Sequence, residues 1–252
     1  MRRRFVLLPV VLLALAGCGG GGSHPPAPTT RPCGEAANGA TAVRFRTSDG
    51  VSLTGDTIGS GPVGAVLIHE YPLDHCGWMP YARYLARHGV RALAFDLRCF
   101  GDSECPDHSG HAVADVAAAT AELRRRGATS VALVGASMGG SIAVVAAARL
   151  HPAALVDLSG ERDTTGLTPR IDADAGAAAH DVTAPSLFAV ARGDRYTPVP
   201  DMRAVARATR APTRRLIVLP AAAGHGWDML LGTSSEWSPL ARTVAAFIRR
   251  HR

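Results

Sequence analysis

The chain has 252 residues, of which 47% are hydrophobic and 19% charged, which suits a globular protein with a sizeable core and excludes disordered and collagen-like chains. The formal net charge is +6, but Arg2, Arg3 and Arg4 lie in a segment that we expect to be removed, which leaves 6 − 3 = +3. The remaining arginines are scattered rather than clustered, so we expect no nucleic-acid partner.

The N-terminal residues predict an export signal. After the three arginines, residues 5–16 are apolar but too few to span a bilayer. They lead into Leu15-Ala16-Gly17-Cys18, which resembles the lipobox of bacterial lipoproteins. This resemblance implies a signal peptide at residues 1–17, a lipid on Cys18 and a location on the extracytoplasmic face of the cell membrane. An ordinary signal peptide on a soluble protein is the alternative, and the route of export, Sec or twin-arginine, stays open.

Residues 18–39 are rich in glycine and proline at their start, and we expect them to form a flexible tether to a domain at residues 40–252. Once Cys18 is set aside, an even number of cysteines remains, which in an exported chain indicates disulfides. These cysteines are Cys33, Cys76, Cys99 and Cys105. Their three possible pairings stay open, and their spacing does not favour a metal site.

The domain alternates strand-like and helix-like segments, which is typical of a mostly parallel sheet covered by helices on both faces. An opening hairpin is expected at residues 41–46 and 51–58. Further strands are expected at residues 63–69, 91–97, 130–135, 153–158, 186–191 and 215–219. Helices are expected at residues 80–88, 112–126, 138–150, 201–207 and 239–250. The short connection between the strands at 153–158 and 186–191 predicts a site with no large lid.

One motif predicts a nucleophile. Gly135-Ala136-Ser137-Met138-Gly139 has the form G-x-S-x-G, and it joins an apolar strand to a helix. The tight turn requires small residues two places before and after the serine, and both are glycine here. We therefore expect Ser137 to project its hydroxyl from a strained turn above the start of a helix.

A serine hydroxyl needs a neighbouring base, which a third group orients. Asp194 follows a late strand in a glycine-containing turn, and His225 follows the last strand between two glycines. This order along the chain predicts Asp194 as the orienting acid and His225 as the base. Asp157, at the end of the preceding strand, is the alternative acid.

Backbone N–H groups are expected to bind the oxyanion. One is that of Met138, the residue after the nucleophile, and the other comes from the loop after an early central strand. In that loop the donor falls by position on Tyr71, because Pro72 has no N–H.

From about residue 40 onward the chain resembles the α/β-hydrolase superfamily. The stretch Asp96-Leu97-Arg98-Cys99-Phe100-Gly101-Asp102-Ser103 is similar to a family loop, D-x-R-G-x-G-x-S, with Cys99 in place of a glycine. The pair His69-Glu70 and the missing lid look most like the dienelactone-hydrolase-like branch. That resemblance implies that Glu70 contacts the resting nucleophile, but the founding members of the branch use cysteine where this chain has Ser137.

These features predict a serine hydrolase that cleaves small carboxylic esters through an acyl-enzyme. A peptidase, thioesterase or perhydrolase would use the same triad, and a non-catalytic binding lipoprotein is the alternative outside enzymes. The sequence contains no P-loop, dinucleotide fingerprint or metal-ligand cluster, so we expect neither a cofactor nor a metal.

Overall fold

The computed structural model describes residues 33–106, 112–168, 172–232 and 236–252. They include an eight-stranded sheet in the order β1-β2-β4-β3-β5-β6-β7-β8. The pairs β1–β2 and β2–β4 are antiparallel and the remaining pairs are parallel, so the predicted mostly parallel sheet is confirmed. The strands are β1 (Thr41–Arg46), β2 (Ser52–Ile58), β3 (Val63–Ile68), β4 (Arg91–Phe95), β5 (Ser130–Ala136), β6 (Ala154–Leu158), β7 (Ser186–Ala191) and β8 (Arg214–Leu219).

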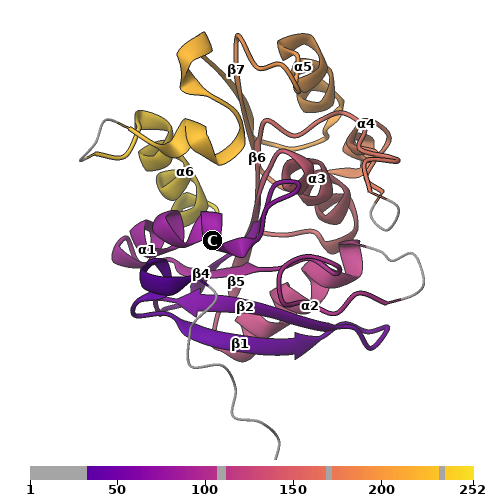
Figure 1. Ribbon diagram of the computed structural model, residues 1–252. Helices are drawn as coiled ribbons and strands as arrows, with labels where there is room; N and C mark the ends of the chain where they lie inside the picture. Colours follow the sequence, from indigo (N-terminus) through magenta and orange to yellow (C-terminus); the bar gives the residue numbers. More distant parts are fainter. Residues whose placement is uncertain (1–32, 107–111, 169–171, 233–235) are drawn as a thin grey trace, which may run out of the picture. The chain divides into compact units, whose positions relative to one another are not determined.

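Helices cover both faces of this sheet. In Figure 1, α1 and α6 lie on one side of it and α2, α3 and α5 on the other. The α-helices are α1 (Met79–Arg87), α2 (Ala112–Arg125), α3 (Met138–Leu150), α4 (Ala175–Ala178), α5 (Val199–Ala208) and α6 (Pro239–Arg250). Two hydrophobic clusters result, one on each face of the sheet.

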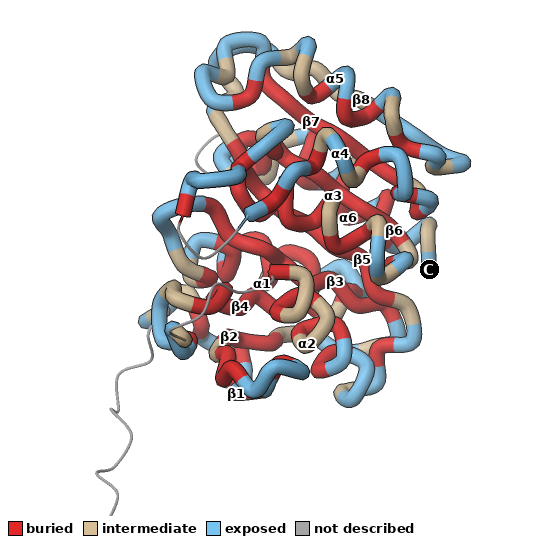
Figure 2. Tube along the Cα trace, turned by 90° about the vertical axis from the view of Figure 1, so that its right-hand side faces the viewer, coloured by how far each residue is buried: buried red, intermediate tan, exposed pale blue. Residues whose placement is uncertain are grey.

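The central strands are fully buried because helices cover both of their faces. Every residue of β3, β6 and β7 is buried, and Figure 2 shows these strands running through the interior. Because such strands have no face toward solvent, their sequences are nearly continuous apolar runs and do not alternate between apolar and polar residues. This is why the sequence predicts them to within a residue or two at each end.

Short helical turns escaped the sequence analysis. The 3-10 turns are η1 (Gly34–Ala37), η2 (His75–Trp78), η3 (Ala179–Asp181), η4 (Ala221–Ala223) and η5 (Gly226–Leu230). They are too short to show the periodicity that reveals a helix. Between β6 and β7 the described residues form α4 and η3, a short connection without a large helical lid.

Residues 33–39, which the sequence assigns to the tether, belong to the same compact unit as the rest of the described chain. The guanidinium group of Arg83 donates hydrogen bonds to the backbone carbonyls of Glu35, Ala36 and Asn38, and Ala37 is fully buried. Glycine and proline upstream made this segment look like part of the linker. The signal peptide and Cys18 lie outside the described residues.

Candidate active site

Ser137 occupies a strained turn between β5 and α3. Its backbone has φ +51° and ψ −125°, a conformation that non-glycine residues rarely adopt. Its N–H donates to the carbonyl of Leu158 at 2.9 Å, which ties the turn to β6. The serine is 7% exposed at the carboxyl end of a central strand. The surrounding structure therefore holds this conformation in place.

Glycines make the turn possible. A Cβ on Gly135 would collide with the carbonyl oxygen of Gly139, and a Cβ on Gly139 would collide with that of Ile68. The requirement for small residues on both sides of Ser137 thus arises from backbone atoms, which have little freedom to move. The same packing brings the start of α3 against the end of β3.

Asp194 and His225 form a hydrogen-bonded pair. Nδ1 of His225 lies 2.8 Å from Oδ2 and 2.9 Å from Oδ1 of Asp194. The carboxylate also accepts the N–H groups of Tyr196 and Thr197, which fixes it in the turn after β7. Both of its oxygens are thus held by donors, and the imidazole has one preferred orientation.

The ionisation of this pair follows from these contacts. Burial by itself raises the pKa of Asp194, but the hydrogen bonds from His225, Ser159 and the loop amides outweigh burial, so its pKa lies below the usual value. Burial lowers the pKa of His225, yet the hydrogen bond with Asp194 and the nearby negative charges outweigh it, and the net pKa is raised. Asp194 is therefore the ionised partner of the imidazole.

Asp157 is engaged elsewhere. It is fully buried, accepts the N–H of Gly160 at 2.7 Å and packs against Gly140. Burial raises its pKa to about 7. In the described part of the chain its side chain makes no hydrogen bond to a histidine, so the geometry favours Asp194 over this alternative acid.

Two further carboxyl groups lie near His225. Glu70, in the loop after β3, accepts the N–H of Trp227 at 2.7 Å, and burial raises its pKa to about 7. Glu161, after β6, is half-buried, and burial likewise raises its pKa. The negative charges of both glutamates raise the pKa of His225. The resemblance places Glu70 against the nucleophile, whereas its observed hydrogen bond is to the loop that carries His225.

The order of the strands places Ser137 between these groups. The segment after β8 reaches past Asp194, which follows β7, to contact Glu70, which follows β3. Ser137 follows β5, which pairs with β3 on one side and β6 on the other. The hydrogen bonds of the described residues include none between Oγ of Ser137 and Nε2 of His225. The structure thus joins Asp194 to His225 and places Ser137 at the same edge of the sheet.

The two predicted oxyanion donors also lie at this edge. Met138 is the first residue of α3, and first-turn N–H groups have no acceptor within their own helix. Tyr71 lies in the loop after β3, and its side chain is exposed. A positive helix end beneath Ser137 favours the negative charge that forms during attack on a carbonyl.

Three residues near His225 were not singled out from the sequence. The ring of Tyr196 packs against the imidazole with centroids 4.9 Å apart. Ser159 has φ +57° and its carbonyl accepts the hydroxyl of Thr197, so it supports the turn of Asp194. Glu161 lies two residues further on. All three follow the carboxyl end of a strand, and this position is the one sequence signal that could have marked them as site residues.

The predicted disulfides are confirmed, and their pairing is now defined. Cys33 is bonded to Cys76, and Cys99 to Cys105. His75 lies beside the first bridge, so three potential metal ligands fall within 4.8 Å of one another. A disulfide sulfur is not the thiolate that metals bind, which argues against a metal at this place.

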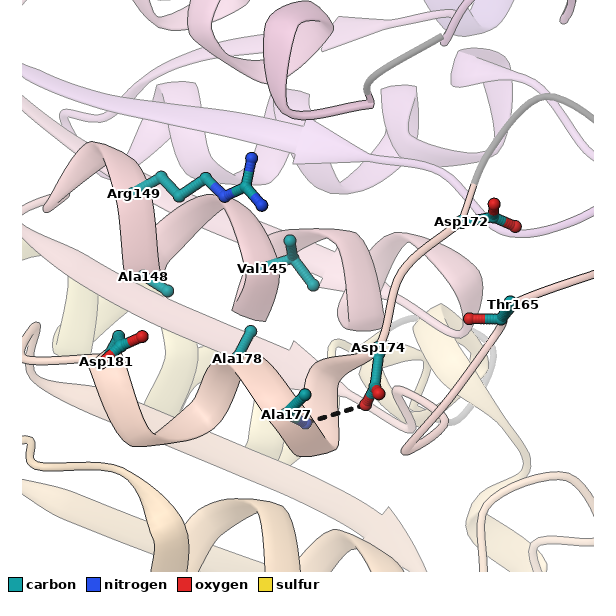
Figure 3. A pocket seen from close by; sticks show the side chains of 9 residues that line it. All are labelled: Val145, Ala148, Arg149, Thr165, Asp172, Asp174, Ala177, Ala178 and Asp181. Atoms are coloured by element: carbon teal, nitrogen blue, oxygen red, sulfur yellow. Dashed lines mark hydrogen bonds between the residues drawn. The ribbon is translucent and has the colours of Figure 1, made fainter. Parts of the chain in front are cut away.

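A separate hollow lies on the outer face of α3. Its volume is about 410 Å³, and Figure 3 shows it between α3 and the segment around α4. The side chain of Asp174 caps α4 by accepting the N–H of Ala177. The residues that line the hollow are Val145, Ala148, Arg149, Thr165, Asp172, Asp174, Ala177, Ala178 and Asp181. Ser137, Asp194 and His225 are not among them, so this hollow is distinct from the candidate active site.

Comparison with known proteins identifies the family. The sequence model of the Alpha/beta hydrolase family matches residues 65–251, which is more than half of the chain. The chain belongs to this family. The match includes the elbow of Ser137 and both residues of the Asp194–His225 pair.

Individual relatives are distant. A region of 101 residues is 35% identical to Epoxide hydrolase 3 of Siraitia grosvenorii, and the match covers 38% of this chain and 31% of that protein. The chain therefore spans about a third of the length of this relative. A membrane phospholipase A, described as a bacterial virulence factor, is 18% identical, with a TM-score of 0.68 over 85% of this chain and 87% of its own.

Two esterases of known structure share the fold. An esterase of Pyrococcus furiosus is 18% identical, with a TM-score of 0.71 over 84% of this chain and 92% of its own. An esterase of Thermogutta terrifontis is 19% identical, with a TM-score of 0.67 over 84% of this chain and 99% of its own. At this identity the likeness establishes the α/β-hydrolase fold but not the reaction, which depends on the residues of the site. Within the described residues, no helix combines the length and apolarity needed to cross a membrane.

Proposed function

We propose that the protein is a serine hydrolase that cleaves carboxylic esters through an acyl-enzyme. The observation that carries this proposal is the hydrogen-bonded pair of Asp194 and His225 at the sheet edge where Ser137 occupies a strained turn. A base oriented by a carboxylate, at the same sheet edge as a serine hydroxyl, is the arrangement that activates a serine.

In the proposed reaction, Oγ of Ser137 attacks the ester carbonyl while Nε2 of His225 takes its proton. The tetrahedral oxyanion accepts hydrogen bonds from the N–H groups of Met138 and Tyr71. The C–O bond to the alcohol then breaks, and His225 protonates the leaving oxygen. Water attacks the acyl-enzyme with His225 as base, which releases the acid and restores Ser137. In each half-reaction His225 takes up one proton and passes it on, so the imidazole is neutral again at the end.

The test is Ser137→Ala, assayed on short p-nitrophenyl esters and labelled with a fluorophosphonate. We expect hydrolysis to fall by about 10⁴-fold or more, because the nucleophile is lost, and labelling to disappear. Ser48→Ala, in the exposed hairpin turn between β1 and β2, is the control and should retain both. Unchanged hydrolysis in Ser137→Ala would reject the serine mechanism. A wild-type chain that is folded but inert to the probe would support a binding lipoprotein instead.

A peptidase or thioesterase would use the same three side chains. The assay therefore includes a peptide anilide and an acyl thioester at equal concentration. The ester is expected to react faster than the anilide, because an alkoxide is a better leaving group than an amide nitrogen and the described residues include no second domain to grip a peptide.

We also propose that the chain is exported and anchored through a lipid on Cys18. Two disulfides support export, because such bonds persist mainly in oxidising compartments. The expected result is incorporation of labelled palmitate by the wild-type chain and its loss in Cys18→Ala. Incorporation that survives Cys18→Ala would contradict the assignment.

A further inference from the structure

Large apolar side chains are exposed at one edge of the molecule. Those with the greatest exposure among the described residues are Tyr71, Leu73, Leu167, Tyr196 and Leu231. Each lies in a connection that leads from a parallel strand to the next α-helix. Such connections leave the carboxyl edge of the sheet, where the candidate active site lies. Exposed apolar groups at the edge that carries the candidate site are suited to an interaction surface.

One of these side chains contacts the candidate site directly, and a second packs beside it. The ring of Tyr196 packs on His225 with centroids 4.9 Å apart. The ring of Tyr71 meets Phe100 edge-on at 6.2 Å, and Phe100 in turn packs against His69 at 4.9 Å. Leu73 follows in the same loop as Tyr71 and is 47% exposed. We call Tyr71, Leu73, Phe100 and Tyr196 the apolar rim.

The first described residue is tied to the loop that carries Leu73. Cys33 is bonded to Cys76, which lies three residues after Leu73. His75 donates its backbone N–H to Asp96 at the end of β4, so the bridge lies at the carboxyl edge of the sheet. At about 3.5 Å per extended residue, residues 19–32 reach at most about 50 Å from this point. An anchor on Cys18 would therefore pull on the edge that carries the rim.

We propose that the apolar rim enters a lipid surface and that Ser137 acts on long-chain esters held in that surface. This inference rests on the proposed function, whose site it deepens by naming the substrate class. Aromatic side chains with a polar end, such as Tyr71 and Tyr196, are suited to the boundary between acyl chains and headgroups. The exposed groups beside the rim carry both signs, with Arg192 and Arg195 near Tyr196 and Asp102 near Phe100. A zwitterionic surface therefore fits better than a strongly charged one.

The reaction at the surface is the same acyl transfer. Oγ of Ser137 forms a bond to the acyl carbon, the bond from that carbon to the alcohol oxygen breaks, and His225 returns its proton to that oxygen. Water then releases the fatty acid. The rim lowers the cost of reaching the substrate, because a long-chain ester need not leave its apolar surroundings to reach Ser137.

The test uses the full chain with Cys18→Ala, so that a covalent lipid does not contribute. It is mixed with vesicles of dioleoyl phosphatidylcholine that carry methylumbelliferyl oleate, and separately with dissolved methylumbelliferyl butyrate. Leu73→Asp is the test variant, because Leu73 lies in the rim and outside the catalytic groups. Thr129→Asp, which adds the same charge at the opposite edge of the sheet, is the matched control.

We expect the unlipidated chain to sediment with the vesicles and to hydrolyse both esters. Leu73→Asp should lose about tenfold in vesicle binding and in oleate hydrolysis, and change butyrate hydrolysis by less than about twofold. Thr129→Asp should match the parent on all measures. Butyrate hydrolysis with neither vesicle binding nor oleate hydrolysis would overturn the lipid-surface inference alone. Equal losses on both esters in Leu73→Asp would also overturn it. Failure to hydrolyse either ester would overturn the proposed function as well.

Discussion

The carboxylate of Glu70 accepts the backbone N–H of Trp227 at 2.7 Å, although 157 residues separate the two in the sequence. Gly226, between His225 and Trp227, has φ +53°, and a Cβ there would collide with Glu70. The contact joins the loop after β3 to the loop that carries the imidazole. We therefore expect Glu70 to position the loop of His225.

Glu70→Gln tests the electrostatic part of this role. The amide keeps an oxygen for the N–H of Trp227 but removes the negative charge that raises the pKa of His225. Because His225 must be neutral to accept a proton, the acidic limb of the kcat/KM profile should move to lower pH. Glu35→Gln, on the exposed turn η1, serves as the control and should leave the limb in place. A limb that stays or moves upward in Glu70→Gln would show that this charge does not act on the base.

Glu70→Ala tests the hydrogen bond. It leaves the Trp227 N–H without its acceptor, which costs about 1–2 kcal/mol and loosens the loop of His225. We expect kcat/KM to fall by about tenfold or more, while Glu70→Gln retains most of it. If kcat/KM is retained in Glu70→Gln and lost in Glu70→Ala, the hydrogen bond matters more than the charge, as a positioning role requires. Equal losses of kcat/KM in both variants would contradict the positioning role.

Asp194→Asn distinguishes the two carboxylates considered from the sequence. The amide cannot hold the imidazole in its productive tautomer, so kcat should fall by about 10³–10⁴-fold with little change in unfolding free energy. Asp157→Asn is the matched comparison, because Asp157 binds the N–H of Gly160 and no histidine among the described residues. It should keep kcat within about threefold. The reverse ranking in steady-state kinetics would transfer the acid role to Asp157.

The parts of the site that the sequence predicts are those set by local backbone geometry. Gly135 and Gly139 lie at fixed offsets from Ser137. The backbone atoms that exclude larger residues belong to the turn itself and to the adjacent end of β3. Asp194 and His225 follow buried strands, whose apolar runs are visible in the sequence. Chain order then limits which acid and which histidine can meet.

What the sequence does not predict depends on how distant loops meet. The hydrogen bond from Trp227 to Glu70 and the packing of Tyr196 on His225 arise only when strands far apart in the chain become neighbours. The pairing of Cys33 with Cys76 is of the same kind. Residues 34–37 were assigned to the tether because a single 3-10 turn shows no periodicity, although Ala37 is fully buried.

The two disulfides should contribute unequally to stability. The Cys33–Cys76 bridge closes a loop with a sequence separation of 43, and Cys99–Cys105 one of 6. Loop-closure entropy then predicts about 4 kcal/mol for the first bridge and about 2 kcal/mol for the second. Denaturant unfolding of the paired variants Cys33→Ala/Cys76→Ala and Cys99→Ala/Cys105→Ala measures these costs. Equal losses, or a larger loss for the shorter loop, would contradict the prediction.

His75 should make stability depend on alkaline pH. Its buried imidazole lies 2.7 Å from Asp96 and 3.2 Å from Asp56. Burial lowers the pKa of His75, but the two carboxylates outweigh burial and raise it to about 9, above the usual 6.5. A pKa that is higher in the folded state stabilises the fold fully below pH 6.5, and this contribution is lost as pH rises through about 9.

The measurement is the free energy of unfolding of wild type and His75→Asn between pH 6 and pH 10. The linkage amounts to about 3 kcal/mol, so the advantage of the wild type over His75→Asn should shrink by that order as pH rises. His180→Asn, at an exposed position beside α4, is the control and should follow the wild type throughout. An advantage that stays constant or grows towards pH 10 would mean that His75 is neutral between its two carboxylates, because only the protonated imidazole gains from both of them.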